Sequence, residues 1–281
     1  MSSSASSAGF GLLSAASWGG ADFVGGMGSR RAPALLVVVS GDSVSLLVLL
    51  VICWMMRLAL PAPHDLLCAA LAGAVGALAL TVFYRALSMG AMGLTAALTG
   101  LLTALIPVLY SIAQDGLPSM LTVIGLATGC AAIWLITRTP SSEGAGTPPK
   151  ALLMGAVAGL GFGMQLILFK MASGGGVLWA MTTSRAAAVA ALLVFLVAMP
   201  PKGPWRGFWL TGIAAATLDT LGTLLYMRTA LLGRLVVAAV ICSLYPAGTI
   251  LLAALVLREW PTLRQMAGMA LALGAVVLLS V

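Results

Sequence analysis

Residues 83–119 read FYRALSMGAMGLTAALTGLLTALIPVLYSIAQDGLPS, and residues 225–262 read LYMRTALLGRLVVAAVICSLYPAGTILLAALVLREWPT. The two stretches carry the same features in the same order. Each has an aromatic residue, an Ala-Leu pair, a turn with glycine and an apolar segment with one internal proline, Pro107 or Pro246. Each then ends on an acidic residue near another proline. Such self-similarity indicates an internal repeat.

The composition indicates a membrane protein. Of the 281 residues, 61% are hydrophobic and only 7% are charged, whereas soluble domains carry roughly 25% charged residues. Because charged side chains cover a soluble surface, this composition excludes a soluble globule. A disordered chain is excluded as well, because it would be poor in apolar residues.

Ten apolar segments follow one another along the chain, separated by short connections with Pro, Gly or charge. A span needs roughly 20 apolar residues, and lipid cannot hydrogen-bond an open backbone, so each segment is predicted to be a helix. We therefore predict an all-α, polytopic integral membrane protein with ten transmembrane helices. The segments are 8–27, 34–56, 66–88, 91–113, 119–137, 151–171, 177–199, 207–229, 235–257 and 262–281.

The most polar connection lies near the middle of the chain and divides the segments five and five. The predicted domains are a first five-helix repeat at 1–137, a polar linker at 138–150 and a second repeat at 151–281. With an odd number of helices in each, the second repeat enters the membrane from the opposite side. Inverted repeats of this kind let one binding site face two compartments in turn.

The charge pattern describes the connections between helices. The formal net charge is +7, but no basic run exceeds Arg30-Arg31, so no nucleic-acid partner is expected. Nine Lys and Arg residues lie at odd-numbered connections and four at even ones. The positive-inside rule places the odd connections in the cytoplasm and both termini outside. An even number of helices puts both termini on the same side.

The sequence contains no motif that predicts a cofactor. The four cysteines are far apart, and His64 is the only histidine, so neither a metal site nor a disulfide framework is expected. No Walker motif is present in the sequence, so ATP would have to act through a separate subunit.

Four ionisable residues lie deep within apolar segments: Asp22, Asp42, Arg185 and Asp219. Such a group costs about 2.5–3.5 kcal/mol at the bilayer centre, so a functional site is the default interpretation. Asp42 and Arg185 occupy equivalent places in the two repeats, and we expect them to pair. Two interpretations stay open: a static lock between helices, or a gate that breaks during transport.

Two helical faces add candidates for substrate contact. Trp18 and Asp22 share one face and fit an amine or aromatic substrate; alternatively, Trp18 only packs and Asp22 reaches the membrane surface, since we expect the helix to end near Gly25-Gly26. Asp219, Thr223 and Tyr226 form a polar stripe. Asp219 is our candidate for proton binding or gating; the alternative is a structural hydrogen bond.

The remaining candidates are cavity and hinge residues. Thr99 lies in a run of threonines at four-residue spacing, and Tyr84 and Gln165 are placed only by depth. Pro107 and Pro246 each remove a backbone hydrogen bond and are predicted hinges, or they only shape the bundle.

Several short motifs point to a known family. They are Trp18-Gly19, Phe162-Gly163, Ala230-Leu231, Ser243 to Pro246, Arg258-Glu259, and Gln265 with Gly268. With them the chain resembles the drug/metabolite transporter superfamily, specifically the EamA-type ten-helix transporters. The first half departs from the pattern, with Asp115 where the family usually has Glu and no Gln before Gly125.

The resemblance implies a multi-pass carrier of the bacterial inner membrane for amino acid-like metabolites, nucleobases or drugs, commonly an exporter. It implies alternating access around a central cavity, driven by protons or by exchange, in a monomer or homodimer. It also implies cytoplasmic termini, against the charge pattern, and we leave this open. A membrane scaffold or channel is the alternative. A lipid enzyme fits less well, because no catalytic cluster is visible in the sequence.

Overall fold

The computed structural model describes residues 2–90, 92–115, 120–138, 148–205, 207–232, 245–258, 260 and 262–279. These residues form ten α-helices and one short 3₁₀ helix, with no strand among them, which confirms the predicted all-α class. The elements are α1 (Ser2–Arg31), α2 (Ala34–Met55), α3 (Pro63–Leu87), α4 (Met92–Asp115), α5 (Met120–Arg138), α6 (Pro149–Met171), η1 (Ser173–Gly175), α7 (Val177–Ala198), α8 (Phe208–Leu232), α10 (Tyr245–Leu257) and α11 (Leu263–Leu279).

Each predicted segment coincides with one described helix, with differences at the ends. The largest is in α1, which begins at Ser2 and continues to Arg31, so the expectation that it ends near Gly25-Gly26 is wrong. A Cβ at Gly25 would overlap the ring of Tyr84, so this glycine allows a close helix contact and does not end the helix. Residues 235–244 of the ninth segment, and most of the linker at 138–150, lie outside the described residues.

The outer surface of the bundle is apolar. Five helices, α2, α3, α6, α7 and α8, are long and apolar enough to cross a membrane, and shorter apolar stretches lie in α4, α5, α10 and α11. Large apolar side chains face outward on them, among them Val197, which is 83% exposed. Lipid tolerates such a surface and water does not, so the chain is a multi-pass membrane protein.

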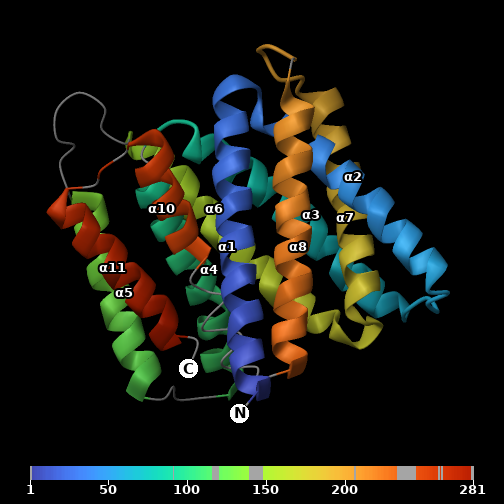
Figure 1. Cartoon of the computed structure of the whole chain (residues 1–281), viewed down its shortest axis with the longest axis horizontal. Coiled ribbons are helices and arrows are strands. Elements are labelled where there is room, and N and C mark those ends of the chain that lie inside the picture. Colours follow the sequence, from blue (N-terminus) through green and yellow to red (C-terminus); the bar gives the residue numbers. More distant parts are fainter. Residues whose placement is uncertain are drawn as a thin grey trace.

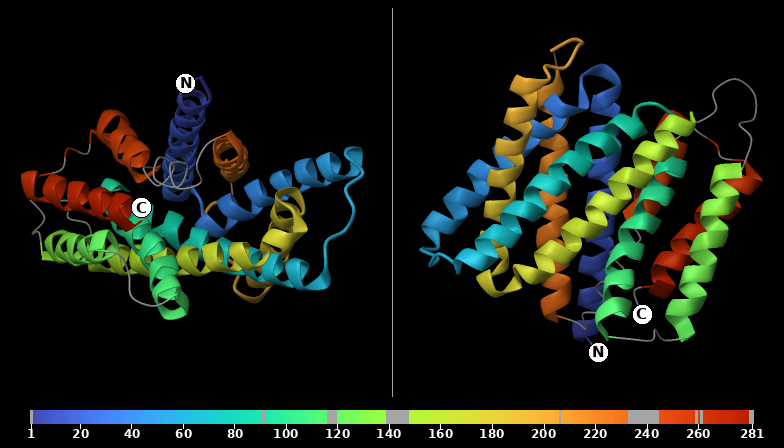
Figure 2. Two further views of the ribbon diagram at one scale, coloured as in Figure 1. Left: turned by 90° about the horizontal axis from the view of Figure 1, so that it is seen from below. Right: turned by 180° about the vertical axis from the view of Figure 1, so that it is seen from behind.

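The helices run back and forth across one bundle (Figure 1). α5 and α11 pack together at one edge, and α2 and α7 lie at the opposite edge. α1 is central and packs against α8 and α10. It starts at the same end of the bundle at which α11 finishes, and the view from behind in Figure 2 shows the same arrangement.

The helix contacts are matched between the two halves of the chain. α1 packs on α8 as α6 packs on α3, and α1 packs on α10 as α6 packs on α4. Likewise α2 packs on α8 as α7 packs on α3. The pairs α2 with α7, α4 with α10 and α5 with α11 join counterparts directly. This pattern is what a twofold relation between five-helix repeats would produce.

Small residues set how closely the helices of the two halves cross. A Cβ at Gly41 of α2 would overlap the carbonyl of Gly212 in α8, and one at Gly73 of α3 would overlap the backbone of Ser184 in α7. Gly41 and Ser184 directly precede Asp42 and Arg185. The two crossings therefore fix the depth at which these charged residues enter the interior.

Gly73→Ala tests the crossing of α3 and α7. We expect it to lower the free energy of unfolding by about 1–3 kcal/mol, because the added methyl group meets backbone that cannot move aside alone. The matched control is Gly274→Ala in α11, where nothing lies within 4 Å of the added Cβ; it should be neutral or stabilising by up to about 1 kcal/mol. Unfolding in mixed detergent micelles measures both, and equal stabilities would contradict the close crossing.

Candidate charged site in the helix bundle

A charged triad joins three helices in the interior of the bundle. Arg185 of α7 donates from Nη1 to Oδ1 of Asp42 in α2 at 2.6 Å. Its Nη2 donates to Oδ2 of Asp219 in α8. The Asp42 side chain is 3% exposed and that of Asp219 is 32% exposed. The planar guanidinium has five N–H donors, so it can serve both carboxylates at once.

The equivalence of Asp42 and Arg185 in the sequence explains one arm of this triad. Asp42 is the ninth residue of α2, and Arg185 is the ninth residue of α7. Both residues lie near the middle of their helices, and α2 and α7 pack directly on each other, so the two side chains can meet. The predicted contact is therefore present in the structure, while its role as a lock or a gate is untested.

The second arm, from Arg185 to Asp219, was not predicted. The sequence pattern indicates only that Asp219 lies on a polar stripe of its helix, and it does not connect Asp219 with Arg185. The number of charged residues deep in the apolar segments could have indicated this second ion pair. The sequence has one arginine and three aspartates at such positions, and one guanidinium can bind two carboxylates.

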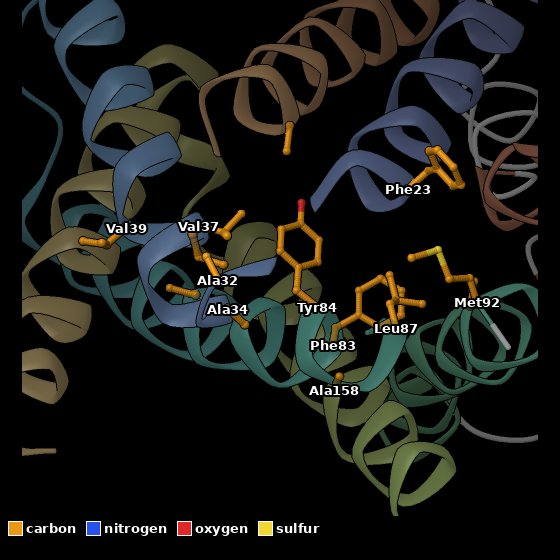
Figure 3. Close-up of a cluster of buried hydrophobic side chains, with 14 of the residues drawn as sticks. Phe23, Ala32, Ala34, Val37, Val39, Phe83, Tyr84, Leu87, Met92 and Ala158 are labelled. Carbon is orange, nitrogen blue, oxygen red and sulfur yellow. The ribbon is translucent and has the colours of Figure 1, made fainter. Parts of the chain in front are cut away.

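The triad lines a small cavity with room for about one water molecule. Tyr84 of α3 lines the same cavity. Its side chain extends away from Phe83 and Leu87 (Figure 3), and its hydroxyl donates to the carbonyl of Ala21 at 3.3 Å. Oδ2 of Asp42 is buried and has no hydrogen-bond partner among the described residues. The cavity therefore offers an acceptor that is free in this part of the chain.

The polar face of α1 meets the polar stripe of α8. Trp18 Nε1 donates to the Thr223 hydroxyl at 3.4 Å, and Thr223 donates to the backbone carbonyl of Asp219 at 3.0 Å. Ser14 donates to the carbonyl of Gly222 at 2.7 Å. The two predicted faces therefore lie against each other, next to the triad.

The structure separates several other candidates from the triad. Thr99 is buried and donates to the carbonyl of Gly155 at 2.9 Å, which joins α4 to α6. Gln165 of α6 packs against Gly76 of α3. Tyr226 belongs to α8, but its side chain lies outside the described residues.

The two predicted hinges differ in their setting. Pro107 lies inside α4, which continues to Asp115. Pro246 lies in the first turn of α10 and packs against Gly100 of α4. A first-turn proline removes no helical hydrogen bond, and the residues before α10 lie outside the described part of the chain. Hinge motion at either position stays a prediction.

One polar contact near the triad escaped the sequence analysis. The hydroxyls of Ser45 in α2 and Thr220 in α8 lie 3.1 Å apart. Ser45 comes one helical turn after Asp42, and Thr220 directly follows Asp219. The crossing of α2 and α8 therefore carries a hydrogen bond beside the ion pairs.

These features define a class of protein: an all-helical membrane protein with paired charges inside its bundle, as membrane transporters have. Residues 149–281 match the EamA-like transporter family. The second half of the chain is thus an EamA-like transporter domain, and the resemblance indicated by the motifs is confirmed. The match covers a little less than half of the chain and is to a family of membrane transporters.

Solved structures agree with this fold, and thirteen chains among them match. The crystal structure of one other protein aligns with a TM-score of 0.66 and 17% sequence identity, over 98% of this chain and 96% of that chain. At this identity the likeness concerns the fold alone. No curated protein matches the sequence.

Replacing Arg185 tests the energetics of the triad. Arg185→Gln leaves Asp42 buried without its partner and should lower the free energy of unfolding by about 3–5 kcal/mol. The added change Asp42→Asn should restore part of that loss, because it removes the unpaired charge. Arg85→Gln, at an exposed position in α3, serves as control and should stay within about 0.5 kcal/mol of the parent protein. A double variant no more stable than Arg185→Gln alone would argue against the pairing.

Proposed function

We propose that this protein is a secondary active transporter that moves a small metabolite across the membrane by alternating access. The observation that carries the proposal is the buried triad, in which Arg185 holds helices from both halves of the chain together. Charges inside a membrane bundle are retained where they serve a pathway or a moving part.

The matched helix contacts support two repeats that can exchange conformations. Within the described residues, α2 packs against α1 and α3, whereas α7 packs on neither α6 nor α8 to a comparable extent. The side chains of Arg185 in α7 and Asp219 in α8 nevertheless form an ion pair across the two helices. If the repeats exchange conformations, the packing of α7 against α8 and that of α2 against α3 both change.

The geometry supports different roles for the two ion pairs. The pair of Asp42 and Arg185 joins equivalent helices, so a symmetric exchange of conformations preserves it. The pair of Arg185 and Asp219 has no counterpart, because the middle of α3 has no acidic residue. We therefore assign the lock to the first pair and the gate to the second.

Coupling to protons follows from the balance of charge. Asp42 and Asp219 share one guanidinium, and Asp22 has no cationic partner among the described residues, which leaves excess negative charge in the membrane interior when all three are ionised. Asp219 is the more exposed carboxylate of the triad. It is placed to take up a proton, and protonation would release it from Arg185 while Asp42 keeps its pair.

Transport in liposomes tests both the carrier and its coupling. The purified protein is reconstituted, and amino acids, nucleobases and amines are screened for counterflow with and without a pH gradient. We expect saturable flux of at least one compound, accelerated by the gradient. Absence of saturable flux across the panel would contradict the carrier.

In Asp219→Asn, we expect accumulation driven by the gradient to fall at least tenfold while counterflow persists. The control is Asp65→Asn, a carboxylate in the first turn of α3 and outside the triad. Gradient-driven accumulation that survives Asp219→Asn unchanged would rule out Asp219 as the proton site.

The location and orientation are part of the proposal. We place the protein in the bacterial inner membrane as an exporter, on the strength of the family resemblance. Arg30 and Arg31 lie at the end of α1, and the positive-inside rule puts this end in the cytoplasm and the start of α1 outside.

A fusion at the C-terminus tests the orientation. Alkaline phosphatase fused there should be active and green fluorescent protein dark, because both report export of the C-terminus. The reverse result would place the termini in the cytoplasm, as the family resemblance implies.

A further inference from the structure

Asp22 is an intramembrane carboxylate outside the triad. It lies nine residues before the end of α1 and is half-buried among the helices. Within the described residues it makes neither a hydrogen bond nor an ion pair, and its carboxyl group lies near that of Asp219 in α8. Two neighbouring carboxylates, only one of them paired, favour a positive charge between α1 and α8.

Aromatic rings from three helices lie around this part of α1. Trp18 is one turn before Asp22 on the same face. The ring of Tyr84 packs against Gly25, and its hydroxyl reaches the carbonyl of Ala21. Tyr245 of α10 makes an edge contact with Trp18, with 6.3 Å between the ring centroids. Aromatic faces beside a carboxylate attract organic cations through cation–π contacts.

Close packing through glycine brings these rings to α1. A Cβ at Gly19 would lie 2.7 Å from the carbonyl oxygen of Tyr245, and one at Gly25 would overlap Tyr84. The two glycines are six residues apart, with Asp22 midway between them. The helices that carry the rings therefore approach α1 on either side of the free carboxylate.

The same site disfavours an anionic substrate. Arg185 is already engaged by Asp42 and Asp219, so it is not free to receive a carboxylate. An anion would also meet the negative charge of Asp22. Among small metabolites, a compound with a positive charge and an apolar or aromatic body complements these groups.

We propose that the transported substrate is an organic cation, an amine with an aromatic or apolar body, whose charge is held by Asp22 beside Trp18 and Tyr84. The inference rests on the proposed carrier function and names the substrate class of its site. Trp18 packs against Gly222 of α8 in this conformation, so binding requires α1 and α8 to separate.

Binding of a matched series of phenyl compounds tests the inference. Tritiated 2-phenylethylamine is bound to the purified full-length protein in detergent. It is then competed with 2-phenylethyl-trimethylammonium, with neutral N-acetyl-2-phenylethylamine and with anionic 3-phenylpropanoate. We expect the two cations to bind at least tenfold more tightly than the neutral and anionic analogues. Equal affinities across the series, or no saturable binding of either cation, would overturn the inference.

Two variants assign the binding to Asp22. Asp22→Asn should weaken binding of both cations at least tenfold and leave the neutral analogue unaffected, whereas Asp22→Glu should keep most of the affinity. Asp65→Asn is the control and should bind like the parent protein. Unchanged cation binding in Asp22→Asn would overturn the assignment. Should Asp22→Asn fail to fold, the comparison of cationic and neutral analogues on the parent protein decides.

The outcome is separable from that of the proposed function. Saturable liposome flux of a neutral or anionic metabolite, without cation binding, would remove the substrate class and leave the carrier standing. Absence of any saturable flux in the liposome panel removes the carrier itself.

Discussion

The structure depends on keeping charge inside an apolar bundle. A lone guanidinium in lipid is costly, and so is a lone carboxylate. Arg185 and Asp42 reduce this cost by pairing across the contact of α2 with α7. The pairing requires two helices from opposite halves of the chain to meet at the same depth. The close helix crossings at Gly41 and Gly73 hold the two helices at that depth. The packing of small residues therefore determines where the charged side chains lie.

The third charge of the triad makes the arrangement asymmetric. A single pair between equivalent helices would give a symmetric and static bundle. Asp219 binds the same guanidinium from α8, and nothing in α3 balances it. The site is therefore asymmetric inside a nearly symmetric scaffold. In the proposed function, protonation of Asp219 breaks this asymmetric ion pair and allows the two conformations of the repeat to exchange.

The fold was predictable from the sequence because lipid leaves few choices. Apolar segments of about 20 residues must become helices, and ten of them were visible between the breakers. The pair of Asp42 and Arg185 was predictable too, because both stand at the same position of equivalent helices. The ends of α1 were not predictable from the sequence. Gly25-Gly26 resembles a helix end in the sequence, but in the structure these glycines admit Tyr84 and Leu87.

The site was only partly predictable, for a related reason. The bond of Asp219 to Arg185 depends on how α8 packs beside α7, and sequence periodicity does not fix helix neighbours. Thr99 shows the same limit in the other direction. Its spacing fitted a cavity lining, yet its hydroxyl joins α4 to α6. The depth of a polar residue in the membrane can be predicted from the sequence. The residue that it contacts on a neighbouring helix depends on how the helices pack.

We propose that the contact of α2 with α7 persists while α7 and α8 move relative to each other. Distances between spin labels on these helices test this directly. After replacement of the four native cysteines, one label pair is placed at exposed Leu47 and Val194, on α2 and α7, and a second pair at exposed Val194 and Leu210, on α7 and α8. Distance distributions are recorded with and without a transported substrate. We expect the distance between Leu47 and Val194 to stay constant and the distance between Val194 and Leu210 to shift with substrate. A first distance that changes, or a second that does not, would contradict this proposal.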